Sequence, residues 1–112
     1  MFPEITEIID EIINGQGYVL LPDLITAQEA AAARQLVLEL AEQSRQEGKL
    51  LVQEQKERLY GLIYKDDIFA QMAQHESLLA IIEAMIGENV VLGGLSAHIL
   101  HPGAKSMGIH VD

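Results

Sequence analysis

The sequence contains no cysteine among its 112 residues. That absence excludes disulfide bonds, thiolate metal sites and cysteine nucleophiles, and it fits a reducing compartment. No apolar stretch approaches the roughly 18 residues that a membrane-spanning helix needs. The chain also lacks the basic segment followed by an apolar run that opens a signal peptide. We therefore expect a cytoplasmic protein that does not associate with a membrane.

Basic side chains are also scarce, with 7 Lys and Arg against 17 Asp and Glu and a formal net charge of −10. The first thirty residues contain neither Lys nor Arg. Nucleic-acid binding needs clustered basic side chains, so this composition argues against nucleic acid and against an anionic membrane surface as partners. Hydrophobic residues make up 49% of the chain, which is enough for one domain with a buried core.

Several segments carry helix signals. A stripe at helical spacing predicts an amphipathic helix near the N-terminus, formed by Ile5, Ile8, Ile9, Ile12 and Ile13. Thr26 and Glu29 fit a capping box that opens a helix running to about Glu47. Asp66 or Asp67 can cap a short helix, and a further apolar helix ends at Gly87.

Strand signals are concentrated in the second half of the chain. We predict a short strand at 18–21, a strand or extended arm at 58–64, and two strands at 90–92 and 95–100 around a pair of glycines. Residues 48–57 have no clear periodicity and indicate a loop or a weak strand, and a last strand begins at 109. The order of helices first and strands later predicts an α+β fold.

The tripeptide His-Val-Asp at residues 110–112 contains two side chains that can bind a metal ion. In a strand, His110 and Asp112 lie on the same face and can converge on one ion. One imidazole and one carboxylate, joined by a second His, form the facial triad of non-haem iron(II) oxygenases. The spacing alone is weak, because His-x-Asp also arises by chance, and two polar residues at a frayed terminus are the simpler interpretation.

The remaining histidines and glycines favour structural roles. His98 and His101 are spaced as H-x-x-H, but Pro102-Gly103 argues against a helix there, so we interpret them as a strand histidine and a turn histidine. His75 lies between two predicted helices and suits a surface or capping position. The glycines fit neither nucleotide-binding loop pattern, and the chain has no serine nucleophile elbow.

The order of the segments is more specific than any single motif. The stretches "GYVLLPDLITAQEAAAARQLVLEL" (17–40), "KDDIFAQMAQHESLLAIIEAMIGENVVLGGLSAHILHPG" (65–103) and "HPGAKSMGIHVD" (101–112) together cover most of the chain. They resemble the N-terminal part of the phytanoyl-CoA dioxygenase family. In that family a strand ending in Pro leads into a capped helix, then to two helices, the first barrel strands and the His-x-Asp loop.

This resemblance implies a 2-oxoglutarate- and Fe(II)-dependent oxygenase built on a double-stranded β-helix, or jelly roll. Residues 1–112 then form a single partial domain, with a mainly helical part at 1–89 and the first barrel strands and metal-motif loop at 90–112. His110 and Asp112 match the first two iron ligands. The family's third ligand, a distal His, and its 2-oxoglutarate-binding Arg lie beyond the matched part. We therefore expect a small-molecule hydroxylase whose activity needs more than this chain.

Two other interpretations remain open. The chain can be a non-catalytic helical binding or oligomerisation module derived from that fold, with its apolar faces covered by a second copy or by a missing C-terminal half. Alternatively, His110 and Asp112 of two copies can surround one ion in a symmetric dimer.

Overall fold

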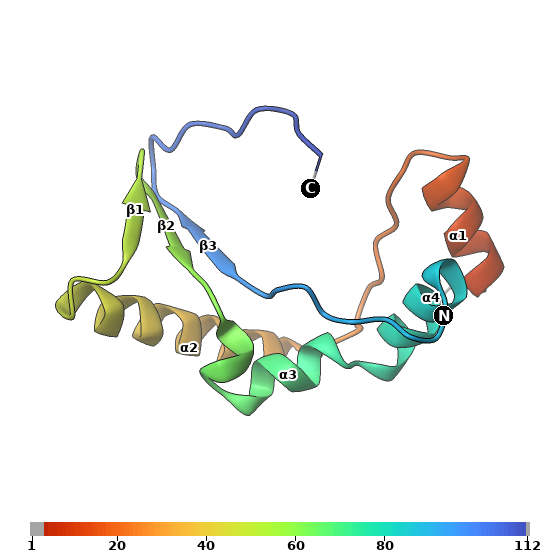
Figure 1. Ribbon diagram of the computed structural model, residues 1–112, viewed down its shortest axis with the longest axis horizontal. Coiled ribbons are helices and arrows are strands. Elements are labelled where there is room, and N and C mark those ends of the chain that lie inside the picture. Colours follow the sequence, from red (N-terminus) through yellow and green to blue (C-terminus); the bar gives the residue numbers. More distant parts are fainter. Residues whose placement is uncertain (1–3, 112) are drawn as a thin grey trace.

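The computed structural model describes residues 4–111, in which four α-helices and one three-stranded antiparallel sheet are arranged as Figure 1 shows. The elements in chain order are α1 (Ile5–Ile13), α2 (Ala27–Gln46), β1 (Leu51–Gln53), β2 (Lys56–Leu59), the 3₁₀-helix η1 (Leu62–Tyr64), α3 (Asp67–Ala73), α4 (Glu76–Ile86) and β3 (Ala97–Leu100). The mixture of helices and sheet confirms the predicted α+β class. None of the described helices combines the length and apolar character that crossing a membrane requires.

The long helix α2 begins where the sequence predicts. The backbone N–H of Glu29 donates to Oγ1 of Thr26 at 3.0 Å, and the backbone N–H of Thr26 donates to Oε2 of Glu29 at 2.7 Å. Both bonds of the predicted capping box are therefore present. The helix ends one residue before the predicted Glu47.

The two later helices also begin at predicted caps. Asp66 accepts the backbone N–H of Ile68 at 3.0 Å and opens α3. His75 accepts the backbone N–H of Ser77 through Nδ1 at 3.2 Å and opens α4. The interpretation of His75 as a capping residue is thus confirmed.

The sheet has the order β1-β2-β3, with β2 in the centre. Glu54 and Gln55 form the two-residue turn between β1 and β2, with positive φ angles of 49° and 64°. Positive φ at both turn positions matches the right-handed twist of a hairpin. Residues 48–57 were expected to form a loop or a weak strand because they show no clear periodicity, and the pair also lacks the Asn-Gly or Asp-Gly that such turns favour.

Several predicted strands are wrong. Residues 18–21, 90–92 and 109–111 lie outside any strand, and the segment at 58–64 divides into the end of β2 and the 3₁₀-helix η1. The prediction at 95–100 is shortened to β3. The failed segments have apolar and β-branched residues, but a strand also needs a neighbour to pair with, and no described strand lies beside them. Residue 112 lies outside the described residues.

The main core lies between α2, the sheet and α3. Its buried side chains are Ala41, Leu59, Leu62 and Phe69, and it is surrounded by the half-buried Leu36, Val37, Leu40, Leu50, Ile68, Leu95, Ala97 and Ile99. We call this set the helix–sheet core. A second and smaller contact joins α1 to α4 at the other end of the molecule, where Ile8 and Ile81 are buried.

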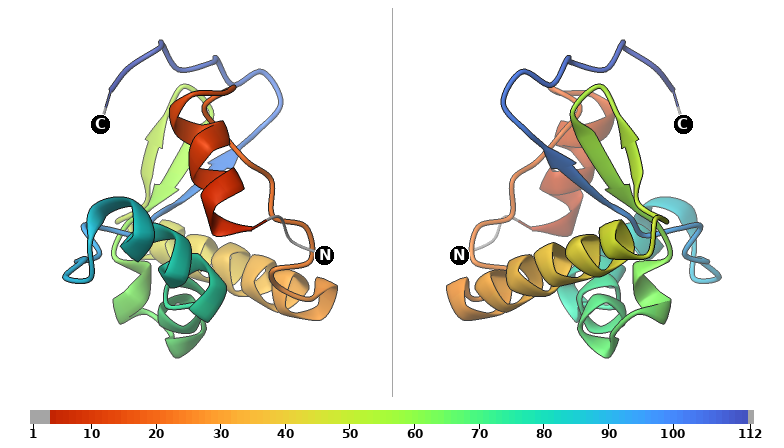
Figure 2. Two further views of the ribbon diagram at one scale, coloured as in Figure 1. Left: turned by 90° about the vertical axis from the view of Figure 1, so that its right-hand side faces the viewer. Right: turned by 90° about the vertical axis from the view of Figure 1, so that its left-hand side faces the viewer.

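The arrangement is open. The radius of gyration is 16.3 Å, whereas a compact domain of this length has about 13 Å. The accessible surface is 8680 Å², against roughly 6,100 Å² for a folded monomer of this mass. Figure 2 shows the reason, since α2 supports the sheet from one side while the segment after β3 extends away from the other elements.

Candidate metal arm and basic sheet face

His110 lies on an extended segment after β3, residues 102–111, which we call the C-terminal arm. The side chains on either side of it, Ile109 and Val111, are fully exposed. Nδ1 of His110 lies 2.9 Å from the carbonyl oxygen of Gly108. A carbonyl oxygen only accepts, so Nδ1 is the donor in this hydrogen bond. Metal-binding histidines are commonly oriented by such a bond to a backbone carbonyl.

The other predicted ligand, Asp112, lies outside the described residues. Within residues 4–111, no three His, Cys, Asp or Glu side chains come together closely enough to hold a metal ion. A complete three-ligand site is therefore not formed by the described residues alone. The described residues alone do not fit an iron site.

A second feature of the site region is a group of basic side chains on one face of the sheet. Side chains alternate along a strand, so Lys56 and Arg58 point away from Glu57 and Leu59, which face α2. Arg58 stands directly opposite His98 of β3 in the strand register. We call Lys56, Arg58 and His98 the basic face, and it lies on the side of the sheet that α2 does not cover.

The basic face carries positive charge without a negative partner among the described residues. Lys56 is 8% exposed, yet neither it nor Arg58 forms an ion pair within residues 4–111. Nε of Arg58 is buried and makes no hydrogen bond there. The other strand residues with this orientation, Leu51, Gln53 and Leu100, are uncharged. An ammonium and a guanidinium that share one uncovered face, with no carboxylate beside them among the described residues, are suited to bind an anion.

On the opposite face, Glu57 is the centre of a charged cluster and is only 5% exposed. Nη2 of Arg45 donates to its Oε2 at 2.5 Å, and Nε2 of His101 pairs with its Oε1. Arg45 also pairs with Glu42, one turn earlier on α2. Burial raises the pKa of Glu57, but the hydrogen bonds from His101 and Arg45 and the charge of Arg45 outweigh burial and leave this pKa below its ordinary value.

The two histidines of the H-x-x-H pattern therefore have separate positions. His98 lies in β3 and His101 lies in the turn that follows it, which confirms the interpretation as a strand histidine and a turn histidine. The sequence analysis missed the basic face and the Glu57 cluster. The alternation of Lys56 and Arg58 was the only signal for the basic face, and nothing in the sequence links Glu57 to a residue 44 positions away.

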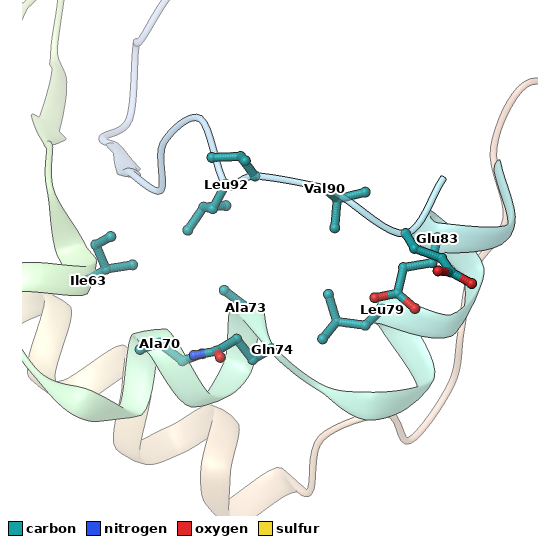
Figure 3. Close-up of a pocket in the computed structure, with 10 residues that line it drawn as sticks. Ile63, Ala70, Ala73, Gln74, Leu79, Glu83, Val90 and Leu92 are labelled. Carbon is teal, nitrogen blue, oxygen red and sulfur yellow. The ribbon is translucent and has the colours of Figure 1, made fainter. Parts of the chain in front are cut away.

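A separate hollow lies between α3, α4 and residues 88–92 (Figure 3). Its volume is about 500 Å³, and most of its walls are apolar, including Ile63, Leu79 and Val90. Glu83 and Glu88 contribute the only carboxylates of the lining, and none of the lining residues is His, Lys or Arg. The hollow shares no lining residue with the arm or with the basic face, so its position does not link it to their chemistry.

Comparison with known proteins adds no relative, because no family model, no curated protein and no solved structure matches the chain significantly. The function therefore has to be argued from the arm, the basic face and the Glu57 cluster.

Proposed function

We propose that this chain is the N-terminal portion of a non-haem Fe(II)/2-oxoglutarate-dependent dioxygenase of the phytanoyl-CoA dioxygenase type. In this proposal β1, β2 and β3 are early strands of a jelly roll, and His110 and Asp112 are two of its iron ligands. The family resemblance supplies the chemistry, in which Fe(II) and 2-oxoglutarate support hydroxylation of a small molecule. The described residues do not complete the iron site, so we derive no step through the metal.

The basic face is the observation that supports this proposal most strongly. Lys56 has no counter-ion among the described residues, and Nε of Arg58 has no acceptor there. 2-Oxoglutarate carries two carboxylates, and in this proposal Lys56 and Arg58 add positive charge for the carboxylate that does not chelate the metal, beside the family's Arg that lies beyond the matched part. The sheet places Lys56 and Arg58 on the face that α2 leaves open, which is where a barrel interior would be.

The open shape supports the further proposal that activity belongs to a more complete domain. In residues 4–111 the outer edges of β1 and β3 have no neighbouring strand, and Leu51, Val52 and Leu100 are exposed. Unpaired edges and exposed apolar side chains are normally covered in a finished fold. We expect no turnover of 2-oxoglutarate to succinate by this chain with Fe(II). Succinate formation that is abolished by His110→Ala would show that the chain is catalytically complete.

Titration with 2-oxoglutarate, followed in ¹H–¹⁵N NMR spectra, tests the proposed co-substrate site. We expect shifts centred on residues 56, 58 and 98, with a dissociation constant of about 1 mM, and their loss in Lys56→Met and Arg58→Met. Lys49→Met is the matched control, because Lys49 is exposed and pairs with Glu47. Shifts that persist in Lys56→Met would place the anion elsewhere, and stronger binding of inorganic phosphate would identify a phosphate site instead.

A second candidate function is a non-catalytic oligomerisation module. One observation favours it: residues 89–100, which include β3, contain no Asp, Glu, Lys or Arg in a chain whose net charge is −10. An uncharged edge strand is where two copies of so acidic a chain could pair without repulsion. Light scattering at high concentration separates the two functions, since a folded chain that stays monomeric contradicts the module.

A further inference from the structure

The hydrogen bonds and the ion pair that hold the base of the C-terminal arm to the sheet are made by His101. Its backbone N–H donates to the carbonyl oxygen of Gln55 at 3.1 Å, in the turn between β1 and β2. Its carbonyl oxygen accepts the backbone N–H of Ala104 at 3.0 Å, which closes the first turn of the arm. Its side chain pairs with the buried carboxylate of Glu57. His101 therefore joins the arm to both the backbone and the interior of the hairpin.

Glu57 is in turn held from α2. Arg45 donates to its second carboxylate oxygen at 2.5 Å, so each oxygen of Glu57 has one charged or polar partner. The groups that face Glu57 are Arg45 and, through Arg45, Glu42 on α2, together with His101 after β3. Its neighbours in the strand register, Val52 and Ile99, are apolar. The carboxylate is therefore held from two sides, and Arg45 and His101 are its charged or polar side-chain partners among residues 4–111.

We propose that Arg45, Glu57 and His101 form a clasp that sets the direction in which the C-terminal arm leaves the sheet. The clasp links the longest helix to the start of the arm, and Pro102 follows at once with a backbone of restricted φ. Loss of the pair between His101 and Glu57 would leave the His101 backbone bond to Gln55 to hold the start of the arm. Glu57 is thus a positioning residue for the arm. That the clasp thereby also positions His110 as a metal ligand rests on the proposed function.

Spin-label distance measurement tests the clasp directly, without metal or 2-oxoglutarate. The chain has no cysteine, so Ala32→Cys on the exposed side of α2 and Val111→Cys on the arm give two unique labelling sites. We expect one narrow distance distribution in this background. Glu57→Gln and His101→Ala should each broaden it, while the circular dichroism of the helices stays unchanged.

Two controls separate the clasp from a general loss of charge or of histidine. Glu47→Gln removes an exposed carboxylate that pairs with Lys49 at 3.3 Å, and His98→Ala removes the exposed strand histidine. Neither should change the distance distribution. Exchange of the His101 and Ala104 amides should accelerate about tenfold in Glu57→Gln and in His101→Ala. The double variant should be no faster than either single variant, because both remove the same interaction.

An unchanged distance distribution in both clasp variants would overturn the proposal. It would also be overturned if the increase in amide exchange rate in the double variant equalled the product of the increases in the two single variants. The outcome is independent of the oxygenase proposal. If the clasp variants change the arm but the chain binds no 2-oxoglutarate, the clasp proposal stands and the proposed co-substrate site is wrong. If the chain binds 2-oxoglutarate but Glu57→Gln does not change the distance distribution of the arm, the clasp proposal is wrong and the proposed co-substrate site stands.

Discussion

The helix–sheet core and the C-terminal arm are held by different kinds of interaction. In the core, Leu62 and Phe69 are buried among many apolar neighbours contributed by α2, α3 and the sheet. In the arm, Ile109 and Val111 are exposed, and its base is attached through the polar contacts of His101. Apolar burial is non-directional and distributed over many residues, whereas hydrogen bonds and ion pairs depend on a few atoms in fixed geometry.

The difference between the two regions predicts different consequences of mutation. Loss of a core side chain removes apolar contacts from several elements at once, so it should lower the free energy of unfolding of the whole chain. Loss of a clasp residue should change mainly where the arm lies. The following predictions test that contrast, from the largest expected effect to the smallest.

Phe69→Ala should have the largest effect. Phe69 is 3% exposed in the centre of the helix–sheet core, and truncation of such an aromatic costs about 3–5 kcal/mol of unfolding free energy. Urea denaturation followed by circular dichroism measures it. Tyr64→Ala is the control, because Tyr64 is 87% exposed and its loss should change stability by about 0.5 kcal/mol or less. Equal effects of the two variants would mean that the core is not packed as described.

Glu57→Gln should have an intermediate effect that depends on pH. Above pH 5 it should cost about 1–3 kcal/mol, because Arg45 and His101 lose the charge of a buried acceptor. The pKa of Glu57 is lowered in the folded state, so its stabilisation is complete above its ordinary value of about 4.5. It is lost as the pH falls through the lower folded-state pKa.

The measurement is the difference in urea midpoint between the wild type and Glu57→Gln across the acid range. This difference should be largest above pH 4.5 and should shrink toward zero at more acid pH. Glu47→Gln provides an exposed comparison, with a smaller difference at every pH. A difference between wild type and Glu57→Gln that grows as the pH falls has the opposite sign and would contradict the clasp geometry.

Gly103→Ala should have the smallest global effect and a local one at the arm. Gly103 has a φ of +86°, and a Cβ there would lie 2.6 Å from Oε1 of Gln55. The left-handed backbone alone costs about 1–2 kcal/mol for a non-glycine residue, which favours opening of the turn at 101–104, and the exposed amide end of Gln55 would have to move aside. Amide exchange at Ala104 measures the opening. Gly108→Ala is matched, since nothing lies within 4 Å of its added Cβ, and it should leave Ala104 unchanged.

The sequence predicted the parts of the fold whose signals are local. The capping box of Thr26 and Glu29 and the caps at Asp66 and His75 are confirmed, because each needs only residues two or three positions apart. The hairpin was missed because Glu54 and Gln55 are unusual residues for its turn. Strands at 18–21 and 90–92 were predicted from composition alone, which contains no information on whether a pairing partner exists.

The candidate site was less predictable, because its groups meet only through the sheet. Glu57 and His101 are brought together by the register of β2 and β3, and the isolation of Lys56 and Arg58 from carboxylates depends on which residues share their face. His110 is described on the arm, but its role as a ligand stays a prediction, as does that of Asp112. An incomplete set of ligands leaves no geometry from which the metal can be inferred.

Paramagnetic line broadening by Mn(II), an oxygen-preferring stand-in for Fe(II), tests most directly the proposal that the arm carries a metal ligand. In ¹H–¹⁵N spectra recorded with 2-oxoglutarate present, the account predicts broadening centred on residues 108–111 that reaches the basic face. The broadening at 108–111 should be lost in His110→Ala and retained in His98→Ala. Broadening centred on the acidic helix α1, or broadening of the arm that is unchanged in His110→Ala, would contradict the assignment of His110 as a ligand.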